Sequence, residues 1–426
     1  VTTAKDITNA TVNANDLNAI LKGAEWVKNG DTYTFDYDGY VDAYYDLTIS
    51  YTDMAMNASD DCKPETFIID HTKPTAPTIT YSTPLKETIL EALTLGFYNP
   101  SVEVTFTAYD LTSGIDYFTW EYTRDNGVSK TNVESYAATK VTAVQDSTDL
   151  SKFTATITLP KNAADQLRGY IKVTATDEYS NLSNRYDDNG KIVVVDTVSP
   201  TMEVTYSEYS NIVGSTMYYG SDKNGQVEVT LNITEANFFS EDVVVKVSKN
   251  GAEATRVSPA WTDVDVDKHI GKFTISGDGH YVVTVEYTDR SANEMRKYTS
   301  DTITLDTIKP VIVVDYQNND VINTLTDRDG RQREYFDKVQ TAVITITEHN
   351  FNADDVQFSI VGKDVTGAER NINSLISKSA WSTNGDVHSI TITYSGDANY
   401  TFDVDYTDLA TNKADDYIPD YFTVDS

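Results

Sequence analysis

The stretch that decides the fold is Gly279-His-Tyr-Val-Val-Thr-Val-Glu-Tyr-Thr-Asp289-Arg-Ser-Ala-Asn293, which is followed by Asp301-Thr-Ile-Thr-Leu-Asp306-Thr-Ile-Lys-Pro310. Apolar and polar side chains alternate in both halves, which is the pattern of β-strands with one buried face. Asp289 and Asn293 bracket a turn, because Asx side chains bond to nearby backbone amides. The stretch therefore predicts the last two strands of a β-domain and the joint that follows it.

This stretch recurs along the chain. The further copies lie at residues 45–74, 170–200 and 399–425. Since each copy is the back half of one domain, the repeat predicts a domain for each of 1–71, 72–197, 198–307 and 308–426. The first lacks front strands and is expected to be truncated at its N-terminus. The second carries an insertion at Thr139 to Asp149.

Composition excludes several classes of function. The 426 residues carry a formal net charge of −33 and a single cysteine, Cys62. So acidic a chain lacks the basic patch that grips nucleic acid or an anionic membrane. One cysteine cannot form an internal disulfide, and no apolar run reaches the length of a membrane span. The first residues do not read as a signal peptide, so we expect that it was removed or that the chain is an excised piece.

About seven strands in roughly 110–125 residues predict an antiparallel sandwich, because open sheets of this size pack face to face. Helical periodicity is confined to Ala163 to Leu167 and Leu85 to Leu95. The Tyr-x-Val-x-Val-x-Tyr-Thr-Asp-x-Ala-x-Asn stretches and the Asp-Thr-x-x-Pro joints (Asp-His-Thr-Lys-Pro in the first) resemble bacterial immunoglobulin-like (Ig-like) domains, found in tandem on Gram-positive surface proteins. The resemblance implies an all-β chain of tandem Ig-like sandwiches on the bacterial cell surface or cell wall, with signal and anchor outside this sequence.

The joints predict the shape of the chain. Pro74, Pro200 and Pro310 fix φ and restrict the residue before them, and the connectors leave little slack. Adjacent domains should therefore sit end to end. With strands of about ten residues, the chain should form a semi-rigid monomeric rod roughly 130–160 Å long.

Acidic and amide side chains recur at the joints. In a sandwich of this topology, the loop before the last strand lies at the pole that faces the previous domain. Two oxygen-rich sets should converge there, namely Asp196, Glu235, Asn237 and Asp289, and Asp306, Glu348, Asn350 and Asp408. Ca²⁺ prefers six to eight oxygen ligands and is the cofactor that such sets would take. The alternative is that these side chains only fix their own loops.

Aromatic residues suggest a binding surface. Tyr37, Tyr40 and Tyr44 lie in a Tyr/Asp-rich segment of the first domain, and Tyr117, Trp120 and Tyr122 alternate in the second. Tyrosine offers rigid contact area at low entropic cost, although strands favour it in any case. Trp26, Trp261 and Trp381 recur at one position of the repeat, which is typical of core or inter-sheet packing; the alternative is a platform on which a ligand stacks.

Catalysis finds no support, because the five histidines are scattered and no nucleophile or phosphate-loop motif is present. Two functions remain. The first is a cell-surface adhesin whose domains recognise a host protein or glycan, such as a glycoprotein or an immunoglobulin. The second is a passive stalk that projects another domain from the cell wall.

Overall fold

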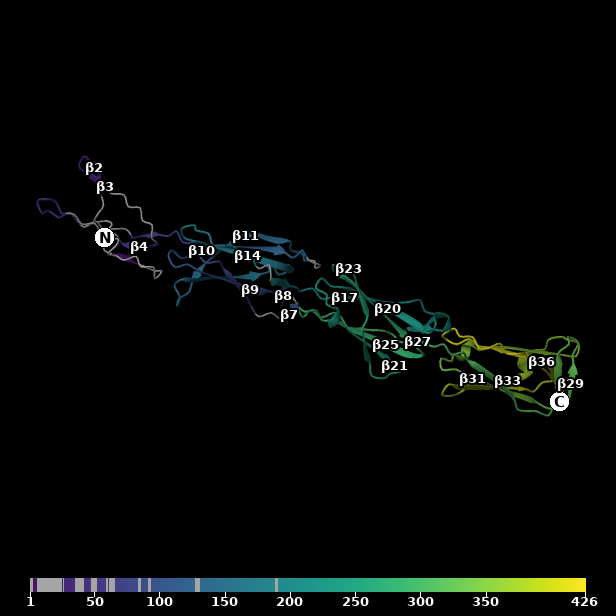
Figure 1. Ribbon diagram of the computed structural model, residues 1–426. Coiled ribbons are helices and arrows are strands. Elements are labelled where there is room, and N and C mark those ends of the chain that lie inside the picture. The colour runs from purple at the N-terminus through teal and green to yellow at the C-terminus, as the bar shows by residue number, and fades with distance from the viewer. Residues whose placement is uncertain are drawn as a thin grey trace.

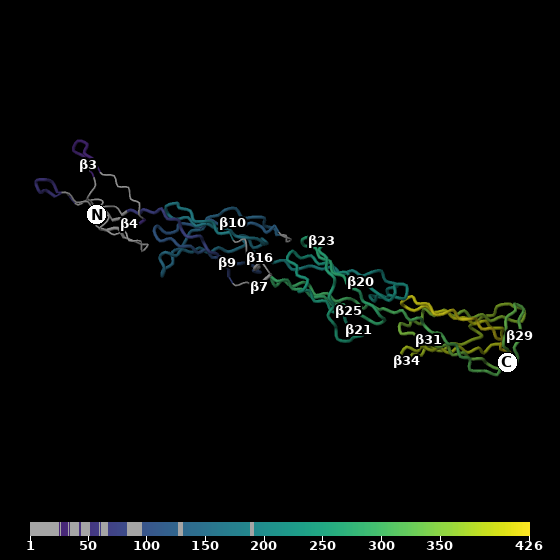
Figure 2. The backbone as a smooth tube through the Cα atoms, viewed as in Figure 1, coloured from purple at the N-terminus to yellow at the C-terminus, as the bar shows by residue number. Residues whose placement is uncertain are grey.

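The structure is a computed structural model that describes residues 3–5, 25, 27–34, 42–46, 52–58, 60, 66–82, 86–90, 93–126, 131–187 and 191–426. The β-domains follow one another end to end, so the described chain is an elongated rod (Figures 1 and 2). The N-terminal and C-terminal ends of the described chain lie at opposite ends of this rod. The fold is a tandem array of Ig-like β-sandwiches.

The second domain packs two sheets face to face. Its smaller sheet has the order β12-β13-β9-β6, with β6 (Thr78–Tyr81), β9 (Val102–Tyr109), β12 (Val144–Gln145) and β13 (Lys152–Leu159). Its larger sheet has the order β11-β10-β14-β16-β8-β7, with β7 (Lys86–Leu90), β8 (Leu93–Tyr98), β10 (Ile115–Arg124), β11 (Ser135–Thr142), β14 (Leu167–Asp177) and β16 (Lys191–Val195). β15 (Tyr186–Asp187) pairs with β14.

The third domain repeats this plan. One sheet has the order β17-β20-β24-β23, with β17 (Thr201–Tyr206), β20 (Gln226–Thr234), β23 (Ala260–Asp265) and β24 (Lys268–Ser276). The other has the order β18-β19-β27-β25-β21-β22, with β18 (Asn211–Val213), β19 (Thr216–Tyr219), β21 (Val244–Lys249), β22 (Thr255–Val257), β25 (Gly279–Glu286) and β27 (Ile303–Leu305). β26 (Tyr298–Thr299) pairs with β25.

The fourth domain follows the same plan. One sheet has the order β28-β31-β35-β33, with β28 (Val311–Tyr316), β31 (Gln340–Thr347), β33 (Ile376–Lys378) and β35 (Val387–Tyr394), and β34 (Ser382–Asn384) pairs with β35. The other has the order β29-β30-β37-β36-β32, with β29 (Asn323–Thr326), β30 (Gln332–Phe336), β32 (Gln357–Lys363), β36 (Ala398–Asp405) and β37 (Asp420–Val424).

In the first domain, the structure describes β1 (Thr3–Lys5), β4 (Ala43–Asp46) and β5 (Thr66–Ile69) in one sheet, and the hairpin of β2 (Val27–Asn29) with β3 (Thr32–Thr34).

One strand pair in each of the last three domains is parallel, which the repeat pattern alone did not predict. β16 pairs with β8, β27 with β19 and β37 with β30. In each case an early strand leaves the sheet of the first strand and lies beside the last strand of the domain. The remaining pairs of these sheets are antiparallel, as expected.

The alternating pattern sets which side chains are buried. In β20, Val227, Val229, Leu231 and Ile233 are at most 1% exposed, whereas the residues between them face outwards. Each of the last three domains has a separate core of this kind. Burying apolar side chains from two facing sheets is the main favourable contribution to folding.

The expected helical segments are absent from the described residues. The segment Leu85 to Leu95 instead contains β7 and the start of β8, which form an antiparallel hairpin in their described residues. Its Thr and Ile residues favour strands, and the hairpin adds an edge to the larger sheet. Short 3-10 turns occur at Ser221–Lys223, Ser240–Asp242, Ala353–Asp355 and Ile372–Ser374. Within the described chain, no helix is long and apolar enough to span a membrane.

A tyrosine at the start of the penultimate strand fastens the end of each of the last two cores. The hydroxyl of Tyr281 donates to the carbonyl oxygens of Ser276 (3.0 Å) and Gly277 (2.5 Å). Tyr400, which is fully buried, donates in the same way to Gly396 (2.5 Å) and Leu375 (3.3 Å). This is the tyrosine corner of Ig-like sandwiches.

We predict that Tyr400→Phe lowers the unfolding free energy of the fourth domain by about 1–2 kcal/mol, because a buried hydrogen-bond donor is lost while the ring stays in place. Chemical denaturation of the chain measures this change. Tyr421→Phe is the control, since Tyr421 is only half-buried and its ring contacts with Arg331 and Arg333 survive the change. Equal effects of the two substitutions would contradict the prediction.

Candidate functional site

Buried carboxylates gather at each described domain joint. The sets are Asp196, Glu235 and Asp289 between the second and third domains, Asp306, Glu348 and Asp408 between the third and fourth, and Asp70, Asp110 and Asp177 between the first and second. In each set, one oxygen from every carboxylate lies within 4.8 Å of the others, and all three residues are buried. One carboxylate follows the last strand of the preceding domain, and the other two belong to the next domain, where all lie in loops except Asp177, the last residue of β14.

An asparagine closes each cluster over the linker. The Nδ2 of Asn293 donates to the carbonyl oxygen of Asp196 (3.1 Å) and to the carboxylate of Asp289 (2.8 Å). The Nδ2 of Asn412 donates in the same way to Asp306 (2.9 Å) and Asp408 (2.9 Å). These bonds tie the linker of one domain to a loop of the next.

A second asparagine acts on the other side of the linker. The Nδ2 of Asn237 donates to Oδ2 of Asp196 at 2.7 Å, and its backbone amide donates to Glu235. Asn350 repeats both bonds, and its Nδ2 donates to Oδ2 of Asp306 at 2.6 Å. The joint therefore has the same hydrogen-bonded frame in two successive copies.

Burial and crowding raise the pKa values of the Glu235, Asp289, Glu348 and Asp408 carboxyl groups. Desolvation by burial raises the pKa of Glu348 to about 7, and the charges of Asp306 and Asp408 add to the rise. Desolvation also raises the pKa values of Asp289 and Asp408 to about 6 each. The pKa of Glu235 is raised by burial and by the nearby Asp196 charge. All these groups therefore favour a bound proton or a bound cation over the bare ionised state.

The donor set suits a hard cation. Within the described residues, no lysine or arginine forms an ion pair with any of these clustered carboxylates. The ligand atoms on offer are carboxylate oxygens, with no thiolate or imidazole among them. Oxygen-only sets of this kind fit Ca²⁺, which tolerates six to eight ligands and irregular geometry.

The eight residues predicted for the two sets lie where the sequence placed them. Asp196, Glu235, Asn237 and Asp289 meet at one joint, and Asp306, Glu348, Asn350 and Asp408 meet at the next. The Asp70, Asp110 and Asp177 cluster was missed. Its signal was present in the repeat, because Asp110 and Asp177 stand where the other domains have Glu235 and Asp289. The Nδ2 of Asn181 completes the likeness by donating to the carbonyl oxygen of Asp70 at 3.2 Å.

In two of the clusters, a stack of aromatic rings packs beside the loop that carries the glutamate. Phe238 lies on His269 with ring centroids 4.1 Å apart, and it contacts Trp261 at 5.0 Å. The Nε2 of His269 lies 2.9 Å from the carbonyl oxygen of Glu235. The fourth domain repeats the stack in Phe351, His388 and Trp381, and the Nε2 of His388 lies 2.9 Å from the carbonyl oxygen of Glu348. The recurrent tryptophans thus pack against the rings that fix the loop; Trp26 lies outside the described residues.

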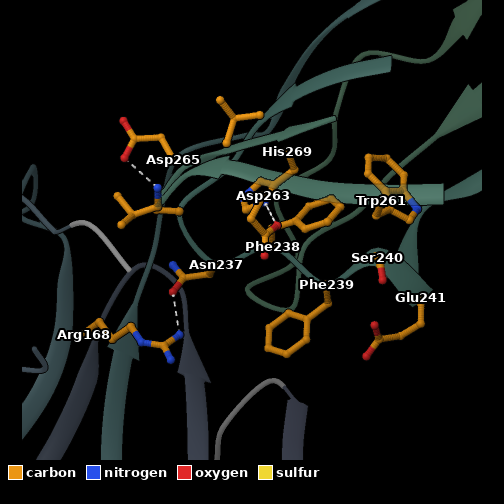
Figure 3. Close-up of a pocket in the computed structure, with 13 residues that line it drawn as sticks. Arg168, Asn237, Phe238, Phe239, Ser240, Glu241, Trp261, Asp263, Asp265 and His269 are labelled. Atoms are coloured by element: carbon orange, nitrogen blue, oxygen red, sulfur yellow. Dashed lines mark hydrogen bonds and ion pairs between the residues drawn. The ribbon is translucent and has the colours of Figure 1, made fainter. Parts of the chain in front are cut away.

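A pocket of about 660 Å³ opens beside the joint of the second and third domains. Figure 3 shows Arg168 of the second domain reaching Asn237, and Phe238 between His269 and Trp261. The bond from Nη1 of Arg168 to Oδ1 of Asn237 is 3.1 Å long. The wall thus combines aromatic rings with polar and charged groups from two domains.

The predicted aromatic surface of the second domain is wrong at two positions. Trp120 is 4% exposed and Tyr122 is fully buried, because they share the inner face of β10 with Phe118. Tyr117 lies on the outer face, where the Nζ of Lys140 is 3.6 Å from its ring centroid. Tyr37, Tyr40 and the side chain of Tyr44 lie outside the described residues.

No protein-family model matches the chain, and no curated protein matches it. Solved structures are similar to it at low identity. They include the Escherichia coli adhesin FdeC (14% identity, TM-score 0.31, 83% of this chain and 98% of that chain), a D1–D4 ectodomain fragment of ICAM-5 (9%, 0.38, 82% and 77%) and invasin, a bacterial integrin-binding protein (14%, 0.35, 82% and 60%). What these proteins bind is a property of those proteins and does not transfer to this chain at such similarity.

We predict that calcium reverses the pH dependence of stability. The pKa values of Asp289, Glu348 and Asp408 are raised on folding, so in the calcium-free chain their contribution to stability is fully present below about pH 4 and is lost as the pH rises through about 6–7. Ca²⁺ holds the ionised form, so its stabilising effect should be large at pH 8 and small at pH 5. Thermal melts with chelator or calcium at both pH values measure this. Glu348→Gln should reduce both the pH dependence and the calcium effect at the joint of the third and fourth domains. Identical melts of the parent with and without calcium would exclude the metal.

We predict that Gly220→Ala opens the joint between the third and fourth domains. A Cβ at Gly220 would lie 2.0 Å from the carbonyl oxygen of Ala410 in the next domain, so that loop must move away. Small-angle X-ray scattering should then show greater flexibility, while the core melting transitions stay near those of the parent. Gly214→Asn is the control, because a Cβ there meets nothing within 4 Å and asparagine tolerates the left-handed backbone of this position (φ 63°). An unchanged scattering curve for Gly220→Ala would show that this contact does not hold the joint.

Proposed function

We propose that the chain is a non-enzymatic, extracellular adhesin of a bacterial cell surface, whose Ig-like domains form a stiff rod that presents a binding surface to a host macromolecule. The observation that carries this proposal is the repeated joint, in which a linker carboxylate is enclosed by the next domain. A protein with no need for fixed domain positions has little reason to bury charge between them. The Gram-positive cell wall suggested by the sequence motif stays a prediction.

We propose further that Ca²⁺ is the ion held at the joints. A cation bound to all three carboxylates of a cluster links two domains directly, because the ligands come from both. Bending at the joint would then require breaking metal–oxygen bonds in addition to hydrogen bonds. In a calcium-rich external medium the rod would be stiff, and in a calcium-poor compartment it would be looser.

We assign the proposed host-binding surface to the pocket beside the joint of the second and third domains. Its wall contains Trp261, Phe238 and Arg168, which are residue types that dominate binding energy at interfaces. The equivalent stack around Trp381 in the fourth domain serves as an internal comparison. A host protein or its glycan is the proposed class of partner, a glycoprotein or an immunoglobulin among them.

The test is capture of host proteins from serum and mucosal secretion on the immobilised chain, with calcium present and at physiological salt. A single enriched protein would then be purified and titrated against the parent chain, Trp261→Ala and the matched control Trp381→Ala. Loss of affinity by about tenfold or more in Trp261→Ala alone would support the pocket. Equal affinity for all three chains would move the binding surface elsewhere.

The second candidate function is a passive stalk. The Pro-containing linkers favour it, because short, restricted connections between domains are what a spacer requires. An empty eluate in the capture experiment, repeated with and without calcium, would favour the stalk over the adhesin.

A further inference from the structure

Two histidines face each other across the joint of the third and fourth domains. His280 is the second residue of β25, and His349 follows β31 in the next domain. Their Nε2 atoms are 3.2 Å apart, and their ring centroids are 5.3 Å apart. Each domain thus directs one imidazole nitrogen to the same point.

The second nitrogen of each ring is held by an oxygen. The Nδ1 of His349 lies 2.8 Å from Oδ1 of Asp386, and the Nδ1 of His280 lies 2.9 Å from Oγ1 of Thr304. A carboxylate accepts hydrogen bonds, so the neutral His349 ring carries its hydrogen on Nδ1 and a lone pair on Nε2. If His280 likewise donates from Nδ1 to Thr304, two lone pairs face each other and require a cation between them.

We propose that His280 and His349 form a binding site for a divalent transition-metal ion of the zinc class, which bridges the two domains. Nitrogens bound to one tetrahedral Zn²⁺ at about 2.0–2.1 Å lie roughly 3.3–3.4 Å apart, close to the observed separation. A histidine ligand whose other nitrogen donates to a carboxylate is the usual arrangement around zinc, and Asp386 takes that place. The His349 side chain is 63% exposed, so water can complete the coordination.

This site lies beside the carboxylate cluster of the same joint, because His349 follows Glu348 and His280 is near Asp306, but its ligand atoms are different. Imidazole suits zinc, nickel and copper, whereas the neighbouring carboxylate set suits calcium. At the joint between the second and third domains, the corresponding positions are held by Arg168 and Ala236. Arg168 matches His280 in strand register, and the stretch Glu235-Ala-Asn-Phe238 matches Glu348-His-Asn-Phe351. Neither of these side chains offers a neutral nitrogen ligand, so the earlier joint is a natural negative control.

The experiment is calorimetric titration of ZnCl₂ into the full chain. Saturating Ca²⁺ is present throughout, so that the oxygen-only sites are occupied and do not take up zinc. We expect one zinc ion per chain, weakened tenfold or more by His349→Ala, which copies Ala236, and by His280→Ala. His71→Ala, which removes an exposed histidine of the first domain, should leave the affinity unchanged. Asp386→Asn should weaken it by about tenfold through loss of the orienting carboxylate.

The fold of each variant is checked by its melting temperature without metal, which should match the parent. Cobalt(II) provides a second readout, because a tetrahedral site gives a visible absorption band that the two histidine variants would lose. Absence of zinc binding by the parent, or full affinity in both histidine variants, would overturn the proposal and leave a direct N–H···N bond between the rings. Either result is independent of the calcium melts, since those depend on the carboxylate clusters.

Discussion

The crowding of carboxylates at the joints is the constraint on which the arrangement of the domains depends. Three acidic groups held within 4.8 Å and out of solvent cannot all remain ionised without a counter-charge. Because one group belongs to the preceding domain, whatever neutralises the cluster also fastens two domains together. The asparagine bonds and the Trp-Phe-His stacks keep the oxygens in place in either state. The stability of the joint therefore depends on whether protons or a cation neutralise the clustered carboxylates.

The two joints share their hydrogen bonds but differ in the side chains around them. The backbone geometry around Asp196 and Asp306 is repeated closely, yet the side chains beside it are Arg168 and Ala236 in one case and His280 and His349 in the other. One joint consequently has a pocket with an arginine in its wall, and the next has a pair of imidazoles. Duplication of a domain supplies the scaffold, and substitutions at a few positions around the joint give each copy its own chemistry.

Much of this architecture could be predicted from the sequence, because internal repeats fix strand register. Alternation in β25 predicted its buried face, and the matching acidic and amide residues of the two sets predicted which loops meet the linkers. Other features needed coordinates. Alternation shows that Trp120 and Tyr122 share a face but not that this face is the interior. The parallel strand pairs join segments about a hundred residues apart, which no local pattern specifies. The Asp110 cluster was hidden because aspartate replaces glutamate in a degenerate copy.

The parallel pairing of β8 with β16 has a mechanical consequence. The chain enters a domain at one pole and leaves it at the other, so tension along the rod pulls an early strand and the last strand in opposite directions. Because these two strands run the same way, the five register pairs from Lys191 and Thr94 to Val195 and Tyr98 are loaded in shear, all at once. An antiparallel hairpin pulled at its open end would instead break one bond after another. The topology therefore suits a protein that must withstand drag while its far end is held.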